Sequence, residues 1–215
     1  MCAIAGMGRG VSLGVARRFG AEGFRIAMLA RRAERLAEFA GELGAGGIEA
    51  RGYAVDLAVE ARLRETFQRI EAELGAPGVL VYNASSGHAG RPSSLCERSL
   101  MADFRLNVVS PLWCVQEVLD GMLEAGRGTI LLTGGGLALA PQADLASLSI
   151  GKAAIRSLAF SLAHELQPAG IHVATVTICG FVQEGTHFSP DRIAEEYWRL
   201  HVQPAGEFAA EVTYK

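Results

Sequence analysis

Short apolar segments alternate with longer amphipathic segments along almost the whole chain. Several of the short segments are continuously apolar, as in Val79-Leu80-Val81 and Ile130-Leu131-Leu132, which is typical of strands buried on both faces. The predicted strands cover residues 2–5, 24–29, 48–54, 78–82, 128–133, 171–178 and 211–214. The predicted helices cover residues 11–21, 33–43, 58–74, 106–125, 149–166 and 190–200.

Strands that alternate with helices predict β-α-β units joined by right-handed crossovers, and hence a parallel sheet. Gly and Pro gather between the predicted elements, at 44–47, 75–77 and 126–128. No internal repeat, low-complexity segment or second domain is visible. We predict an α/β protein with a single doubly wound domain over residues 1–215, in which helices flank a seven-stranded, mostly parallel sheet.

Half of the 215 residues are apolar, a fifth are charged, and the net charge is -3, which is the balance of a soluble globular protein. This charge gives no basic field for nucleic acid, and no apolar run approaches the roughly 18 residues of a membrane span. The four cysteines are far apart, and no export signal is visible, so we expect reduced and mostly buried thiols. These features favour a cytoplasmic protein with no nucleic-acid partner, no membrane partner and no metal site.

A glycine-rich segment, Gly6-Met7-Gly8-Arg9-Gly10-Val11, directly follows the first predicted strand. Glycines at this place allow a tight turn and let the backbone approach a pyrophosphate, which then lies at the N-terminus of the next helix. The segment therefore favours nucleotide binding. The alternative is a tight strand-to-helix turn without a ligand.

The end of the second predicted strand bears on the choice between NAD and NADP. An acidic residue there would bind the ribose hydroxyls, whereas an arginine can pair with a 2′-phosphate. The chain has Arg31 and Arg32 there, with no carboxylate before Glu34, and Arg9 adds a cation nearby. We therefore expect NADP(H) rather than NAD(H). The alternative is that both arginines are simply the solvated start of a helix.

The pattern Gly6-x-x-x-Gly10-x-Ser12 resembles the Thr-Gly-x-x-x-Gly-x-Gly fingerprint of the short-chain dehydrogenase/reductase family. Ala5 replaces the threonine and Ser12 the last glycine, which is expected to move the helix slightly away from the sheet. Further motifs of the family follow in order up to about residue 182, and together they imply a Rossmann-type fold. The glycine-rich segment and this resemblance together imply a set of cofactor-binding residues. They are Gly6, Gly8, Arg9, Gly10, Val11, Arg31, Asp56, Leu57, Asn83, Ala84, Lys152, Gly180 and Val182.

The resemblance also implies a catalytic asparagine and a catalytic lysine, at Asn107 and Lys152. Two other side chains that carbonyl-reducing relatives use are absent. Leu148 stands four residues before Lys152, where the resemblance implies the proton-donating tyrosine, and Gly135 stands where it implies the serine. A missing general acid typically costs 10²–10⁴-fold in rate. The sequence therefore predicts an atypical active site.

Several groups could replace the missing side chains. Ser147 and Ser149 flank the vacant position, Lys152 could act as an acid if burial lowered its pKa, and His88 could reach the site from its loop. Thr133 lies two residues before the vacant serine position, and backbone N–H groups of the following glycines could form an anion nest. None of these replacements is favoured by the sequence alone.

Residues 183–204 are expected to form a short substrate lid. Glu184 stands in the place of a threonine that contacts the diphosphate in relatives, and Thr186 could serve instead. Aromatic side chains of this segment either line an apolar pocket or pack one small helix, and the second alternative is favoured. They are His187, Phe188, Tyr197, Trp198 and His201.

The resemblance implies a homodimer or homotetramer that pairs the helices at 106–125 and 149–166. The apolar residues expected at this interface are Trp113, Val118, Leu119, Ile155 and Phe160. The simpler alternative is that these side chains pack on the sheet. The predicted function is NADP(H)-dependent hydride transfer to or from a small carbonyl, alcohol or related substrate. The alternatives are a catalytically silent NADP(H)-binding sensor or scaffold and an interaction module without a ligand.

Overall fold

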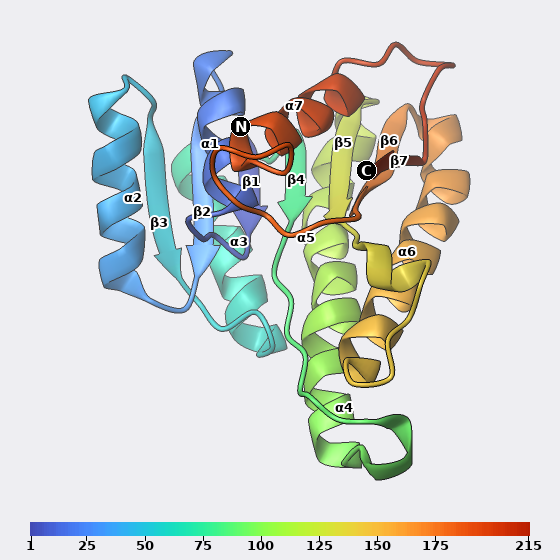
Figure 1. Cartoon of the computed structure of the whole chain (residues 1–215). Helices are drawn as coiled ribbons and strands as arrows, with labels where there is room; N and C mark the ends of the chain where they lie inside the picture. Colours follow the sequence, from blue (N-terminus) through green and yellow to red (C-terminus); the bar gives the residue numbers. More distant parts are fainter.

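Seven strands form one sheet in the computed structural model, which describes residues 1–215 (Figure 1). Their order is β3-β2-β1-β4-β5-β6-β7, and every neighbouring pair is parallel. The predicted sheet is therefore confirmed, and it is parallel throughout. The strands are β1 (Cys2–Ala5), β2 (Ile26–Ala30), β3 (Ala50–Ala54), β4 (Val79–Tyr82), β5 (Gly128–Thr133), β6 (Ile171–Ile178) and β7 (Glu211–Tyr214).

Helices cover both faces of the sheet. One apolar cluster joins α1, α2 and α7 to one face, and a second joins α3, α5 and α6 to the other. The helix α4 lies beyond the carboxyl ends of the strands, at the bottom of Figure 1. The helices are α1 (Val11–Ala21), α2 (Ala33–Ala45), α3 (Glu60–Leu74), α4 (Glu97–Phe104), α5 (Ser110–Ala125), α6 (Ala146–Leu166) and α7 (Pro190–His201).

Strand β1 shows how the sequence builds both halves of the core. Successive side chains of a strand point to opposite faces, so Cys2 and Ile4 join one cluster while Ala3 and Ala5 join the other. A strand between two helical layers can therefore be apolar at every position. The same core contains two residues that were expected at a subunit interface, because Val118 and Ile155 are each only 2% exposed. That expectation is wrong for these two side chains.

The helical segments differ from the prediction at the carboxyl edge of the sheet. The helix α4 was not predicted, and the helix expected from residue 106 begins at Ser110, since Arg105–Val109 forms a π-helical turn. The helix expected from residue 149 begins three residues earlier, at Ala146. No helix is both long enough and apolar enough to cross a bilayer.

The connections leave the middle of the sheet in opposite directions. From β1 the chain runs to β2 and β3, whereas β4 lies on the other side of β1 and leads to β5 and β6. Ligands of doubly wound sheets bind at such a switch point, outside the carboxyl ends of the strands. The edge between β1 and β4 is thus where the fold favours a binding site.

Candidate active site

The turn after β1 is held against the loop that follows β4. Gly6 has a φ of 91°, and a Cβ atom added to it would lie 2.3 Å from the backbone nitrogen of Ala84. The backbone nitrogens of Gly6 and Met7 both donate to the Leu29 carbonyl, at 2.9 Å each. Glycine is therefore required at the first position of the turn, for its backbone conformation and for its lack of a side chain.

Ser12, which replaces the last glycine of the fingerprint, is fully buried at the start of α1. Its hydroxyl donates to the Gly6 carbonyl at 2.8 Å and accepts a hydrogen bond from Asn83 Nδ2 at 2.6 Å. The serine therefore ties the turn to the loop after β4. The side-chain amide of Asn83 is committed to this contact.

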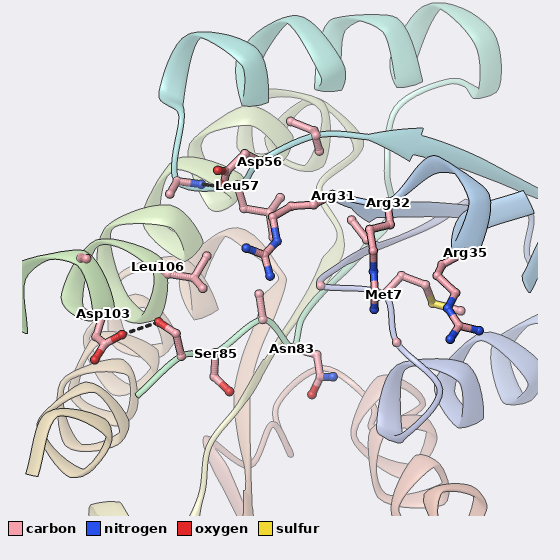
Figure 2. A pocket seen from close by; sticks show the side chains of 18 of the residues that line it. Met7, Arg31, Arg32, Arg35, Asp56, Leu57, Asn83, Ser85, Asp103 and Leu106 are labelled. Atoms are coloured by element: carbon pink, nitrogen blue, oxygen red, sulfur yellow. Dashed lines mark hydrogen bonds between the residues drawn. The ribbon is translucent and has the colours of Figure 1, made fainter. Parts of the chain in front are cut away.

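A cavity of about 640 Å³ opens beside this turn, at the switch point of the sheet (Figure 2). It contains eight of the predicted cofactor-binding residues, namely Gly6, Gly8, Arg9, Arg31, Asp56, Leu57, Asn83 and Ala84. A Cβ atom added to Gly8 would meet nothing within 4 Å, so this glycine faces open space. The backbone of the turn is thus accessible to a ligand of the size of a nucleotide.

Arginines form one end of the cavity. Arg31 and Arg32 point toward the open space in Figure 2 and form no ion pair, whereas Arg35 lines the cavity but is paired with Glu38 at 2.7 Å. Arg9 also lines the cavity, but its guanidinium lies 3.4 Å from a carboxylate oxygen of Glu42. The positive charge available to a ligand therefore comes mainly from the residues that follow β2.

The remaining predicted cofactor residues lie outside the lining of the cavity. Gly10 and Val182 come close together, since a Cβ atom added to Gly10 would lie 3.8 Å from Val182 Cγ1. Val11 is buried, so it offers only its backbone N–H at the start of α1. A Cβ atom on Gly180 would strike the ring of Phe188, which explains glycine at that position.

Asn107 lies in the π-helical turn and holds the loop after β4 in place. It is 3% exposed, its Oδ1 accepts from the backbone nitrogen of Ser86 at 2.9 Å, and its Nδ2 donates to the Ser86 carbonyl at 2.8 Å. The helix α6 packs closely behind it, because a Cβ atom on Gly151 would lie 2.5 Å from Asn107 Nδ2. Both amide atoms are therefore occupied, and the side chain positions the loop.

We expect Gly151→Ala to lower the free energy of unfolding by about 1–3 kcal/mol, the usual cost of overpacking a buried contact. The new methyl group would displace the Asn107 amide and strain its two bonds to Ser86. Urea unfolding measures this change. Gly41→Ala is the matched control, since Gly41 lies in α2 with nothing within 4 Å, and there alanine should stabilise the helix. Equal effects of the two substitutions would contradict the predicted contact.

Lys152 lies one turn after Leu148 on α6, beneath the end of β5. Its Nζ donates to the Thr133 carbonyl at 2.9 Å, and a Cβ atom on Gly135 would lie 3.4 Å from its Cδ and Cε atoms. Burial lowers the pKa of Lys152 from 10.5 to about 8. The ammonium is therefore poorly solvated and close to releasing its proton at neutral pH.

Three hydroxyl groups near the vacant positions are already engaged. Ser147 Oγ donates to Asp103 at 2.5 Å, and Ser149 Oγ donates to the Leu145 carbonyl at 2.9 Å. The Thr133 hydroxyl pairs with the buried hydroxyl of Tyr197 at 2.6 Å. None of the three hydroxyls is free to take the place of the missing serine or tyrosine.

Asp103 forms the centre of a polar cluster that the sequence analysis missed. This carboxylate is 1% exposed and lines the cavity at the end opposite the arginines (Figure 2). Oδ1 accepts from Ser86 Oγ at 2.7 Å, and Oδ2 accepts from the His88 backbone nitrogen at 2.7 Å and from Ser147 Oγ. Burial opposes ionisation, but hydrogen bonds from Ser147 and His88 outweigh it and lower the pKa of Asp103 to about 2.

The spacing of Asp103 and Asn107 could have revealed this cluster. Residues four apart share one face of a helix, so a side chain at 103 belongs on the same side as Asn107. A carboxylate that faces a predicted catalytic asparagine needs hydrogen-bonding partners. The missed helix α4 concealed this relation.

Comparison with known proteins identifies the chain at the level of its family. The family model described as short chain dehydrogenase matches residues 1–194. The chain belongs to the short-chain dehydrogenase family. Its family relatives include the oxidoreductase asL5 of Sarocladium schorii, which is 27% identical over 93% of this chain and 78% of the relative. The human 3-oxoacyl-[acyl-carrier-protein] reductase is 26% identical, and the match covers 97% of this chain and 84% of the length of the reductase.

Solved structures of the family share the fold over nearly the whole chain. A short-chain dehydrogenase from Rhodopseudomonas palustris is 25% identical, with a TM-score of 0.90, and the match covers 100% of this chain and 97% of the other. A metagenomic short-chain oxidoreductase solved in complex with NADP is 27% identical, with the same TM-score, over 99% and 96% of the two chains. The chain is thus a member of an oxidoreductase family.

Leu148 occupies the position at which the resemblance predicts a proton-donating tyrosine. Its side chain packs on the loop after β4, since a Cβ atom on Gly87 would lie 2.7 Å from Leu148 Cβ. An aliphatic side chain can donate no proton. Any proton exchanged with a substrate near this position must come from another residue or from water.

The loop after β6 departs from the family pattern as well. Glu184 is exposed and does not line the cavity. The Thr186 hydroxyl donates to the Gln183 carbonyl at 2.8 Å and accepts from the Phe188 backbone nitrogen at 3.1 Å. Thr186 therefore closes its own turn, which does not support its predicted contact with the diphosphate.

Tyr197 and Trp198 pack the helix α7 against the rest of the protein, as the favoured alternative predicts, whereas His187 is exposed. Tyr197 is fully buried, and Trp198 meets Phe19 of α1 edge to face with ring centroids 5.2 Å apart. His187 stacks on Tyr214 at 4.6 Å. A role of this segment as a substrate lid stays a prediction.

Proposed function

We propose that this short-chain dehydrogenase is an NADP(H)-dependent oxidoreductase that transfers hydride to or from a small carbonyl or alcohol through an atypical active site. One observation carries the proposal: the glycine turn and unpaired arginines line the same cavity at the switch point of the sheet. The metagenomic relative solved with NADP supports it by similarity.

The residues present fit such a cofactor. Open space lies over Gly8, and the backbone N–H groups at the start of α1 would hold the pyrophosphate. Arg31 would pair with a 2′-phosphate, while Asp56 and Leu57 border the place for the adenine. Asp56 Oδ1 already accepts from the Ala58 backbone nitrogen at 3.0 Å, which leaves its second oxygen available.

When bound, the nicotinamide would supply or accept the hydride. Lys152 would hold the hydroxyls of the neighbouring ribose with its ammonium, oriented by the Thr133 carbonyl. Asn107 would keep the loop after β4 in the conformation that forms the cavity wall, through its two bonds to Ser86.

Replacing Arg31 by alanine is expected to weaken NADPH binding about 10-fold to 100-fold, because a hydrogen bond to a charged group contributes about 1.5–3 kcal/mol. NADH binding should change little, since NADH has no 2′-phosphate. Titration followed by nicotinamide fluorescence measures both constants. Arg192→Ala is the control, because Arg192 is exposed on α7, outside the cavity, and forms no ion pair. Equal binding of NADPH and NADH by the wild type would contradict the proposed preference.

A catalytically silent NADP(H)-binding protein is the second candidate function. It is favoured by Leu148 and by the engaged hydroxyls of Ser147, Ser149 and Thr133. NADPH consumption with a panel of small aldehydes and ketones separates the two candidates. Tight NADPH binding without consumption would favour the silent protein, as a sensor or as a homo-oligomeric scaffold.

A further inference from the structure

His88 is the one histidine that lines the cavity, and it lies on the loop that packs against Leu148. It lines the same cavity as the glycine turn, at the end where Asp103 lies. The residue before it, Gly87, packs directly on Leu148. Asp103 bonds both His88 and Ser147, which precedes Leu148 in α6. The imidazole is therefore held next to the part of α6 that carries Leu148.

The hydrogen bond to Asp103 determines which ring nitrogen is available. His88 Nδ1 lies 2.9 Å from Asp103 Oδ2. Because hydrogen bonds keep Asp103 ionised, its oxygens can only accept, so Nδ1 must carry a proton in both charge states of the ring. The atom that gains and loses a proton is then Nε2. It has no hydrogen-bonding partner in the protein, and the side chain is 57% exposed.

The loop that carries His88 is fixed at several points. Asn107 bonds both backbone atoms of Ser86, and the backbone nitrogen of His88 donates to Asp103. Further along, the Gly90 nitrogen donates to the Asp144 carbonyl at 3.1 Å. Such a loop can hold a catalytic group in one orientation, which the reaction requires.

The charges around the ring are few. Asp103 on α4 is the charged group bonded to the His88 ring. From α6, the neutral Ser147 bonds the same carboxylate. Arg91, on the loop that carries His88, is paired with Asp144 at 2.9 Å. Asp103 is thus the charged group that fixes the orientation of the His88 ring.

We propose that His88, positioned by Asp103, exchanges the proton with the substrate oxygen in place of the absent tyrosine. This inference rests on the proposed oxidoreductase function. In the direction of reduction, the carbonyl carbon gains a hydride from NADPH, and the π electron pair moves to the oxygen. The oxygen takes the Nε2 proton, an O–H bond forms, and the ring is left neutral with Nδ1–H bound to Asp103. In oxidation the neutral Nε2 accepts the hydroxyl proton.

The test uses His88→Gln and Asp103→Asn, with His164→Gln as the control, because His164 is an exposed histidine on α6 that forms no hydrogen bond. Histidine NMR of the wild type should show a proton on Nδ1 of His88, and Asp103→Asn should remove this fixed tautomer. A His88 ring without a proton on Nδ1 would overturn the proposal whatever the activity.

Kinetics and binding separate this proposal from the function on which it rests. His88→Gln should leave the Kd for NADPH within about twofold of the wild type and lower carbonyl reduction 10²–10⁴-fold, as expected for loss of a general acid. Reduction that persists within about twofold in His88→Gln would overturn the role of His88 alone, in favour of Lys152 or water. A wild type that fails to bind NADPH, or binds it without reducing any carbonyl of the panel, would overturn the proposed function and this inference together.

Discussion

Replacing Gly6 by valine is expected to abolish NADPH binding and to lower the free energy of unfolding by about 3 kcal/mol. The backbone φ of 91° lies in the left-handed region, where a β-branched residue is strained by about 1–3 kcal/mol. The added atoms would also strike the backbone of Ala84 at 2.3 Å and 2.6 Å, and backbone cannot move aside as a flexible side chain can. Thermal or urea unfolding measures the loss of stability.

Gly8→Val separates the effect on binding from the effect on folding. A side chain at Gly8 would meet nothing within 4 Å, so this variant should unfold like the wild type while its side chain fills the place proposed for the pyrophosphate. We expect NADPH binding to be lost in both variants and stability to fall only for Gly6→Val. A Gly8→Val protein that binds NADPH as tightly as the wild type would show that the nucleotide lies elsewhere.

The fold could be predicted from the sequence because the pattern that defines it is local. Segments such as Val79-Leu80-Val81 are apolar at every position since they lie between two helical layers, and this signal needs no knowledge of partners. The one α-helix missed, α4, is short, and its single buried residue is Asp103. At eight residues it is only about two turns long, which is shorter than the window over which apolar periodicity indicates a helix.

The site could be predicted only in part, since its contacts join distant segments of the chain. The glycine turn and the arginines after β2 were found because each stands at a strand end, and strand ends meet at one edge of the sheet. The bonds from Ser147 and His88 to Asp103 span 44 and 15 residues, and no local pattern indicates them. The sequence therefore suggested His88 as an isolated loop histidine, whereas the structure gives it an orienting carboxylate.

Lys152→Met is expected to remove a pH dependence of stability of up to about 3 kcal/mol. Burial lowers the pKa of Lys152 to about 8 in the folded protein, while the unfolded chain keeps a value near 10.5. Below pH 8 both states are protonated, and the folded state carries the full cost of the desolvated ammonium. Between pH 8 and 10.5 the folded state loses its proton first, so the wild type gains stability as pH rises.

Urea unfolding at pH 7 and pH 10.5, without nucleotide, tests this linkage. From pH 7 to pH 10.5, the unfolding free energy of the wild type should rise by about 3 kcal/mol relative to that of Lys152→Met. The only other lysine of the chain, Lys215, is exposed at the end of the chain, so Lys215→Met should stay parallel to the wild type. Parallel behaviour of Lys152→Met would mean that the ammonium is well solvated, and Lys152 would then no longer be a candidate proton donor near neutral pH. A full shift would mean that Lys152 can titrate near pH 8 in the folded protein. The kinetic effect of His88→Gln must then be compared with that of Lys152→Met before the proton is assigned to either residue.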